Sequence, residues 1–256
     1  MIRSRIQSVL FYLGLILLWQ LVYMIGVDLL SQWKAYAFPN PLGVMESLIK
    51  LIKAGTLVPA VIYSLRRALI GFFLAFLIGA VIGITIAKIA YLNKNLKPLL
   101  MGIQTLPSIC WVPFAILWFG LKESSIIFVV LMGTVGSIAL AIEDSIHGIP
   151  PIYLKAARTM GASRKAMLLH VIAPAALPAF TAGLKQSWSF AWRALMAGEV
   201  LSSCIGLGYT LMMGRDLADI NQVMAVMVVI IAIGIFIDRF LFSKALSRMM
   251  KKRGLY

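Results

Sequence analysis

The chain has 256 residues, of which 61% are hydrophobic and 13% charged, and its mean hydropathy is +0.95. Soluble domains carry about 45–50% apolar and about 25% charged residues, so this composition excludes an ordinary soluble domain and indicates a protein of the lipid bilayer. The net charge of +15 lies in short loops between apolar runs, which favours membrane-orienting charge over a nucleic-acid surface.

Six apolar stretches are long enough to cross a bilayer, because a hydrocarbon core of about 30 Å needs about 20 residues of α-helix. Backbone amides find no water partner in lipid, so each stretch is predicted to be helical even where Val and Ile are frequent. The first stretch follows basic residues as a signal peptide does, yet it lacks a small-residue cleavage site and is expected to remain as a span. The sequence predicts an all-α membrane protein whose six transmembrane helices cover about 8–27, 65–90, 98–119, 125–142, 177–200 and 222–242.

The positions of Lys and Arg predict the orientation of these spans. A cytoplasmic N-terminus puts most of the loop Lys and Arg residues inside, including those after residue 238. It leaves fewer outside, among them Arg66 and Arg67 at the start of the second stretch. Because cytoplasmic loops are enriched in basic residues, both termini are expected to be cytoplasmic.

The long segment 28–60 between the first two spans has a helical pattern of its own. After Pro41, apolar residues recur at helical spacing. This pattern predicts a helix that lies along the outer membrane surface.

The segment 143–176 is predicted to form a helical hairpin on the cytoplasmic side. Pro151 can open a helix and Gly161 can close it. Ser163 can cap a second helix that runs to Pro174. The inner face is therefore expected to present a docking element made of two helices and a tight turn.

The same segment resembles the EAA loop of the permease subunits of binding-protein-dependent ABC importers. That pattern reads Glu-Ala-Ala, three residues, Gly, nine residues, and then an apolar pair ending in Pro. It is matched here by Lys155-Ala156-Ala157, Gly161 and Val171-Ile172-Ala173-Pro174. Further blocks resemble the nitrate, sulfonate, taurine and bicarbonate subfamily, so that the resemblance covers nearly the whole chain: Ser64-Leu65-Arg66-Arg67, Leu106-Pro107, Trp111-Val112-Pro113, Trp118-Phe119-Gly120, Gly198-Glu199-Val200-Leu201 and Gly206-Leu207-Gly208-Tyr209.

The resemblance implies the type I ABC importer permease fold, called MetI-like, in a single transmembrane domain of residues 1–256. It implies a core permease region over 57–242 and a coupling loop over 152–173. The implied partners are two cytoplasmic ATPase subunits that bind ATP and Mg, an extracytoplasmic solute-binding protein and a second permease copy in a homodimer. The chain itself would be a multi-pass protein of the bacterial cytoplasmic membrane, with no cofactor, metal, nucleic acid or enzymatic activity of its own.

The implied function is to form the pathway for a small solute by alternating access. The expected solute is an anion such as a sulfonate, taurine, nitrate or bicarbonate. Relatives that carry thiamine-precursor pyrimidines or aromatic compounds leave those solutes open as alternatives. The chain has no GxxxxGK[ST] phosphate loop, so ATP hydrolysis is assigned to a partner. Two alternatives remain open: an ion-coupled secondary transporter, although the halves show no convincing repeat, and a membrane enzyme, although Glu199 alone offers little chemistry.

The resemblance assigns contact with the ATPase to a short run of residues. Two alanines offer a smooth face for close packing, and a glycine permits a sharp turn. A surface hairpin without a partner is the alternative, which the preserved motif spacing disfavours. Lys155 stands where the family has Glu, so an acidic residue is expected opposite it in the ATPase groove. The assigned residues are Lys155, Ala156, Ala157, Arg158, Met160, Gly161, Ala162 and Ser163.

The fifth span carries ionisable residues, each of which costs at least ~2.5–3.5 kcal/mol at membrane depth and so needs a reason. Arg193 can lie beside the pathway, where a fixed cation lowers the cost of passing an anion, or it can pair with another helix. Arg193 and Glu199 lie about 120° apart on the helix, so each needs a partner elsewhere. Lys185 can extend to the cytoplasmic surface. The stripe predicted to line the pathway or a helix interface consists of Lys185, Ser189, Trp192, Arg193, Met196 and Glu199.

Two prolines interrupt the third span. Pro107 and Pro113 each lack a backbone amide and can kink or break the helix, with Trp111 between them. A broken helix can line a cavity and act as a gate, and a static kink is the alternative. The two cysteines and two histidines have no metal-ligand spacing, so no metal site is expected.

Overall fold

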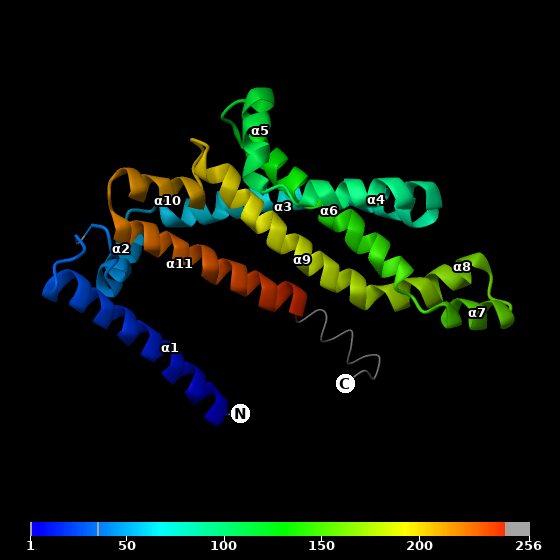
Figure 1. Cartoon of the computed structure of the whole chain (residues 1–256), viewed down its shortest axis with the longest axis horizontal. Helices are drawn as coiled ribbons and strands as arrows, with labels where there is room; N and C mark the ends of the chain where they lie inside the picture. Colours follow the sequence, from blue (N-terminus) through cyan, green and yellow to red (C-terminus); the bar gives the residue numbers. More distant parts are fainter. Residues whose placement is uncertain (1, 35, 244–256) are drawn as a thin grey trace. The chain divides into compact units, whose positions relative to one another are not determined.

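The computed structural model describes residues 2–34 and 36–243 of the chain. The chain divides into two compact units: unit 1 comprises Met1–Tyr63 and Ile205–Ile231, and unit 2 comprises Ser64–Cys204 and Ala232–Tyr256. Figure 1 labels the helices in chain order, and each regular element within the described residues is helical.

Unit 1 contains the helix predicted within segment 28–60. Asn40 caps it, because its side-chain oxygen accepts a hydrogen bond from the backbone amide of Leu42 (3.0 Å). The amide of Asn40 in turn donates to the side-chain oxygen of Asn221 (2.9 Å), which fixes the start of this helix to the start of a later one. The helices of unit 1 are α1 (Ile2–Tyr23) with its π-helical extension η1 (Met24–Leu29), α2 (Pro41–Lys53), α10 (Leu207–Asp216) and the larger part of α11 (Ile220–Ile237).

The core of unit 2 is a bundle of three long helices, α3 (Leu57–Lys88, from Ser64 onward), α6 (Glu123–His147) and α9 (Ala173–Val200). α6 and α9 are antiparallel neighbours, since a Cβ at Gly198 would lie 3.3 Å from Ile126 and the Ser137 and Ser187 hydroxyls lie 2.7 Å apart. α3 runs parallel to α6, as the glycine contacts below show, and antiparallel to α9, since Arg67 pairs with Glu199 and Phe72 packs against Trp188.

Glycines on α3 bring its backbone close to α6. A Cβ at Gly71 would lie 2.7 Å from Val130, and a Cβ at Gly79 would lie 2.9 Å from the backbone oxygen of Val135. Gly83 meets α6 one turn further along, against Ala139. Small residues allow this approach because they leave the backbones free to pack directly.

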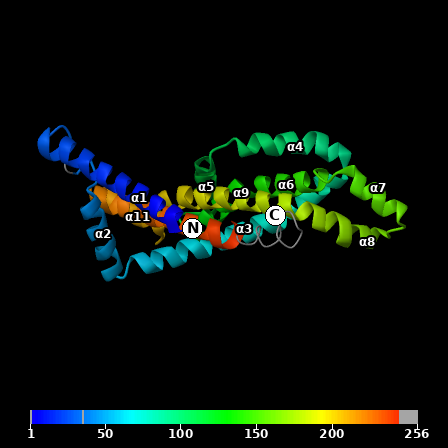
Figure 2. The ribbon, with the colours of Figure 1, turned by 90° about the horizontal axis from the view of Figure 1, so that it is seen from below.

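The third span is broken, where the sequence predicted a helix over 98–119. α4 (Ala90–Gln104) packs antiparallel on α6 and ends at Gln104, and the chain then turns by 98° into η2 (Ser108–Trp111) and α5 (Val112–Phe119). Pro107 stands at the break in an extended conformation (φ −55°, ψ 138°) and offers no amide to continue the helical ladder. Figure 2 shows α4 running alongside α6 and α9 before the chain turns into α5.

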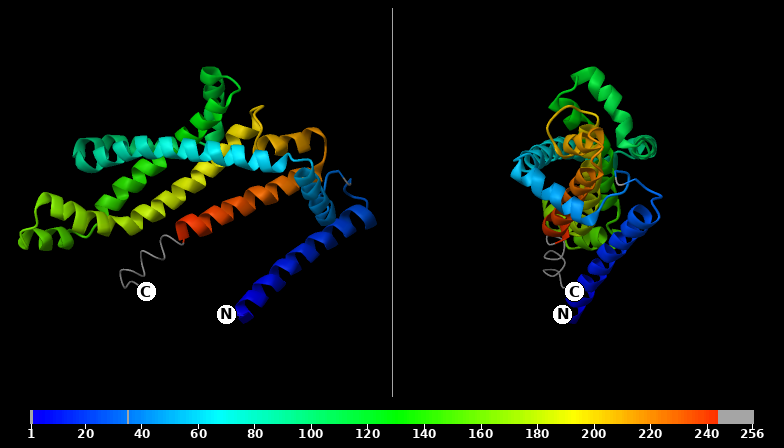
Figure 3. Two further views of the ribbon diagram at one scale, coloured as in Figure 1. Left: turned by 180° about the vertical axis from the view of Figure 1, so that it is seen from behind. Right: turned by 90° about the vertical axis from the view of Figure 1, so that its left-hand side faces the viewer.

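The predicted hairpin after α6 is present as α7 (Pro151–Thr159) and α8 (Arg164–Met167). The second helix does not stop at Pro174: it continues through the π-helical turn η3 (Leu168–Ile172) into α9. In η3 the amide of Ala173 bonds to the carbonyl of Leu168, and this wider turn accommodates Pro174 in the first turn of α9. In Figure 3 this hairpin is the yellow-green segment at one end of unit 2.

The predicted number of six transmembrane helices is confirmed, as judged by the length and apolar composition of the helices. Five helices qualify as spans over 10–29, 57–88, 123–147, 164–200 and 220–240, and the bent pair of α4 with η2 and α5 can supply the sixth. The second span begins at Leu57 and not near residue 65, so Arg66 and Arg67, which the charge pattern assigns to the outer side, lie well inside a helix. The cytoplasmic placement of both termini stays a prediction, and 244–256 lies outside the described residues.

Candidate functional site

The turn of the hairpin is built by a glycine in the left-handed region. Gly161 has φ +73°, which glycine adopts without steric cost. Its amide donates to the carbonyl of Arg158, and the amide of Ala162 donates to the carbonyl of Ala157, both at 3.0 Å. These two bonds form a Schellman motif that ends α7. The Ser163 hydroxyl then accepts from the amide of Ala166 (3.2 Å) and starts α8.

The hairpin exposes most of the residues that the resemblance assigns to ATPase contact. Ala157 is 1% exposed and faces into unit 2, whereas its neighbour Ala156 is exposed. Adjacent helical residues point about 100° apart, so the two alanines serve different surfaces. Ala162 is half-buried, and the exposed members are Lys155, Ala156, Arg158, Met160, Gly161 and Ser163.

A polar cluster ties α4 to α6 just before the hairpin. Glu143 is buried and accepts a hydrogen bond from Asn93 (2.7 Å). It also forms an ion pair with Lys97, which reaches Asp144 at 2.9 Å, and His147 Nδ1 lies 3.0 Å from Glu143. The half-span that leads to the break is thereby fixed to the helix that leads into the hairpin.

A cavity of about 490 Å³ opens where the third span is broken. α4, the break, α6 and α9 each contribute to its wall. Two glycines of α6 let the broken segment approach, since a Cβ at Gly133 would lie 3.1 Å from Ser108 Oγ and a Cβ at Gly136 would lie 3.4 Å from Gln104 Cγ. Most of the lining is apolar, and its polar side chains are those of Gln104, Thr105, Ser108 and Arg193.

Arg193 is the cation of this cavity. Its Nε donates to the carbonyl of Ser189 (3.2 Å), and its guanidinium carbon lies 4.7 Å from the centroid of the Phe190 ring. The side chain is exposed, and no carboxylate of the described part of the chain forms an ion pair with it. The guanidinium thus contacts a backbone carbonyl and an aromatic ring, and the residue lines the cavity.

The residues predicted to form one stripe on the fifth span make contacts in different parts of unit 2. Lys185 forms an ion pair with Asp238 of η4 (Asp238–Ser243) at 3.1 Å. Ser189, Trp192 and Arg193 line a second recess of about 420 Å³, and Met196 is half-buried. Glu199, at the far end of the helix, is 0% exposed and belongs to another group of residues.

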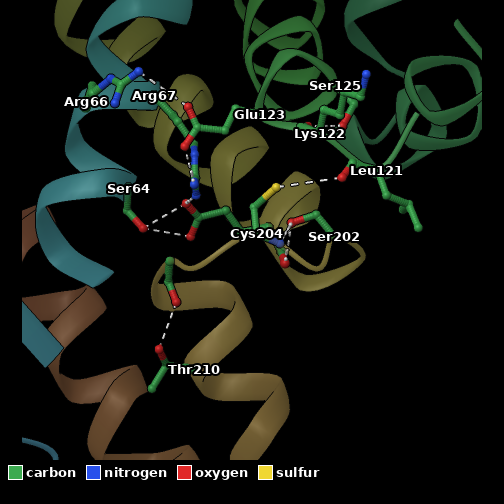
Figure 4. A network of polar contacts seen from close by, with 12 residues as sticks. Ser64, Arg66, Arg67, Leu121, Lys122, Glu123, Ser125, Ser202, Cys204 and Thr210 are labelled. Atoms are coloured by element: carbon green, nitrogen blue, oxygen red, sulfur yellow. Dashed lines mark hydrogen bonds and ion pairs between the residues drawn. The ribbon is translucent and has the colours of Figure 1, made fainter. Parts of the chain in front are cut away.

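Glu199 pairs with Arg67, and Figure 4 shows Arg67 between Ser64 and Glu123. Arg67 Nη1 donates to Glu199 Oε1 (2.9 Å) and its Nη2 donates to Glu123 Oε1 (2.8 Å). The Ser64 hydroxyl lies 2.8 and 2.7 Å from the two Glu199 oxygens. The sequence indicated that Glu199 needs a partner but did not identify Arg67, because the charge pattern groups Arg67 with the outer charges and no local pattern shows which helices pack together.

The residues predicted as a kink or gate have different positions. Pro107 stands at the break, and Trp111 lines the cavity beside it. Pro113 lies in the first turn of α5, where a helix needs no amide donor.

Comparison with known proteins identifies relatives across most of the chain. A family model described as binding-protein-dependent transport system inner membrane component matches residues 75–252. An ABC transporter permease protein of Methanocaldococcus jannaschii is 33% identical over 190 residues, covering 74% of this chain and 71% of that protein. A Bacillus subtilis protein named as an aliphatic sulfonates transport permease is 29% identical over 243 residues, covering 94% of this chain and 86% of that protein.

A solved structure of the MetNI methionine ABC transporter, in an inward-facing conformation, is similar in fold. The TM-score is 0.63 at 20% sequence identity, and the match covers 77% of this chain and 97% of the matched chain. The predicted MetI-like fold is confirmed by this likeness.

Proposed function

Because the chain belongs to the family of binding-protein-dependent transport system inner membrane components, we propose that it forms the membrane pathway of an ATP-driven importer for a small anion. The family and the relatives make the chain a transport subunit and not an enzyme. We assign the permease core to 57–242 within a single transmembrane domain, and the membrane to the bacterial cytoplasmic membrane.

The hairpin of α7 and α8 is the proposed contact with the ATPase. Its turn is fixed by the Schellman motif at Gly161, and its exposed face presents Lys155, Arg158 and Met160. We assign two ATPase subunits, which bind ATP and Mg, to the cytoplasmic side, together with a second copy of this chain in the membrane. A solute-binding protein delivers the solute from outside.

The observation that carries the choice of solute is the position of Arg193. Its guanidinium lies on the wall of a mostly apolar cavity at the broken span, and no described carboxylate neutralises it. A fixed cation in a low-dielectric pathway lowers the cost of an anion there. A sulfonate, as in the name of the Bacillus subtilis relative, suits the charge, and nitrate and bicarbonate satisfy the same requirement.

The proposed mechanism is alternating access. ATP-driven closure of the ATPases displaces the hairpin, and the helices continuous with it, α6 and α9, change the opening of the cavity. The break at 105–107 supports this role, because it leads into the 3₁₀ turn η2, and a 3₁₀ stretch within a helix often marks a hinge. No chemical step takes place in this chain.

The test reconstitutes the permease with its ATPase and binding protein in proteoliposomes and measures uptake of taurine, ethanesulfonate, nitrate and bicarbonate. We expect ATP-dependent uptake of at least one of them, reduced by about tenfold or more in Arg193→Met and partly retained in Arg193→Lys. Lys94→Met is the control, because Lys94 is exposed and does not line the cavity.

Each contrary outcome points to a different error. Normal uptake by Arg193→Met in an intact complex would exclude the role of Arg193 in the pathway. Uptake that persists without ATPase subunits and follows an ion gradient would replace the importer by a secondary transporter.

A further inference from the structure

Arg67 contacts both helices that flank the hairpin, at the ends of those helices farthest from it. Glu123 is the first residue of α6, and Glu199 stands one residue before the end of α9. The guanidinium gives one nitrogen to each carboxylate, at 2.8 and 2.9 Å. A single side chain of α3 therefore joins the start of one helix to the end of the other (Figure 4).

The chain itself closes the same two helices at their opposite ends. α6 ends at His147 and passes through Gly148–Pro150 into α7, and α8 continues through η3 into α9 without a break. Between these ends the two helices pack antiparallel through contacts such as Gly133 with Ala194. The hairpin and Arg67 thus close a loop of covalent and ionic links around α6 and α9.

The charges at this end require a cation between them. Glu199 is 0% exposed, and two carboxylates at the ends of neighbouring helices repel each other when nothing separates them. Arg66 forms an ion pair with Glu123 at 3.5 Å, and its side chain is 57% exposed. Arg67, at 2% exposure, is the residue placed to neutralise both.

We infer that Arg67 is a positioning residue that makes α6, the hairpin and α9 move as one body, so that a displacement of the hairpin reaches the far end of the bundle. The inference rests on the proposed function, in which an ATPase moves the hairpin. Packed helices can still slide against each other where nothing polar holds their ends, whereas a pair closed at both ends transmits the motion along its length.

The shape of the side chain distinguishes this role from simple charge compensation. Guanidinium is a rigid planar fork that can serve two carboxylates at once, while the ammonium of lysine is a single point charge. Arg67→Lys therefore keeps the buried positive charge next to Glu199 but loses the simultaneous bond to Glu123. We expect this variant to fold and assemble, and to lose the transmission.

The experiment measures hydrogen–deuterium exchange of the permease in complex with its ATPase, with and without the ATP analogue AMP-PNP. In the wild type, the analogue should change exchange both at 151–162 in the hairpin and at 196–204 at the far end. In Arg67→Lys the change at 151–162 should remain, and the change at 196–204 should fall by at least about half. Arg66→Lys is the matched control and should behave as the wild type.

A cross-link supplies the rescue. Cys204 Sγ lies 3.9 Å from the carbonyl oxygen of Leu121, which precedes α6, so these residues can be joined without Arg67. In a Cys110→Ala, Leu121→Cys, Arg67→Lys chain, a short bifunctional maleimide should restore the response at 196–204.

The outcomes separate the two proposals. A far-end response that survives in Arg67→Lys would overturn the inference, and so would a loss that the cross-link does not restore. A wild-type complex whose hairpin does not respond to AMP-PNP would instead contradict the proposed function.

Discussion

The guanidinium of Arg67 on α3 and the carboxylate of Glu199 on α9 form an ion pair of 2.9 Å in which both side chains are buried. The hydroxyl of Ser64, one turn before Arg67, lies within hydrogen-bond distance of both Glu199 oxygens. A buried carboxylate is tolerated only when its oxygens are satisfied and its charge is matched. The pair therefore accounts for an acidic residue near the end of a membrane helix.

Removing one partner of this pair should cost more stability than removing both. Arg67→Met removes the guanidinium that pairs with the buried carboxylate of Glu199, and we expect a loss of roughly 3–5 kcal/mol in the free energy of unfolding. Arg67→Met with Glu199→Gln leaves no buried charge at this position and should be less destabilised than the single variant. Reversible unfolding in mixed micelles measures both, and Arg215→Met, which breaks an exposed pair with Asp216, should change little. Equal losses in the single and double variants would contradict the expectation.

The contact between α3 and α6 should not tolerate a side chain at Gly79. A Cβ there would lie 2.9 Å from a backbone oxygen, which cannot rotate away, so Gly79→Leu should destabilise the protein by about 1–3 kcal/mol or more. Gly102→Leu is the matched control, since nothing lies within 4 Å of a Cβ at Gly102. Thermal unfolding in detergent compares the two, and similar melting temperatures would count against direct packing at Gly79.

The turn of the hairpin should depend on the left-handed backbone of Gly161. Gly161→Ala places a Cβ at φ +73°, which costs about 1–2 kcal/mol, although nothing crowds the position. Gly161→Asn should be milder, because asparagine visits this region. We expect Gly161→Ala to weaken co-purification of the ATPase more than Gly161→Asn does. Equal retention by both would show that the turn tolerates the strain.

Lys155 should meet an acidic residue of the ATPase. Its side chain is exposed on α7, where the family pattern has Glu. Lys155→Glu should therefore reduce co-purification of the ATPase, and Lys155→Arg should preserve it, because the expected contact depends on the sign of the charge. Lys165→Glu, an exposed charge reversal outside the motif, serves as the control. Stronger binding by Lys155→Glu would indicate a basic residue in the groove.

The local elements of this protein follow from its sequence. Apolar runs of about 20 residues predict transmembrane helices. In lipid, the backbone N–H and C=O groups of such a run can form hydrogen bonds only with each other, and a helix provides these bonds. The hairpin likewise follows from single residues: Pro151 opens a helix, Gly161 ends it with a positive φ, and Ser163 caps the next. Each of these effects acts within one helical turn, so the neighbouring sequence contains the information.

The third span shows where that information ends. Pro107 and Pro113 have the same chemistry, yet one stands at a 98° break and the other in the first turn of a helix. A missing amide matters only where a helix would otherwise need it. The packing of Ser108 and Gln104 against Gly133 and Gly136 determines where in the third span the helix ends.

The sequence by itself determined the helical class, the number of spans and the hairpin motif, because these depend on composition and on neighbours within a few residues. Only the tertiary structure decided which charges meet. Arg67 and Glu199 are 132 residues apart, and Lys185 meets Asp238 through the packing of α9 on the end of the last span. Coulomb attraction depends on distance in space, and that distance is set by helix packing, which no local pattern of residues specifies.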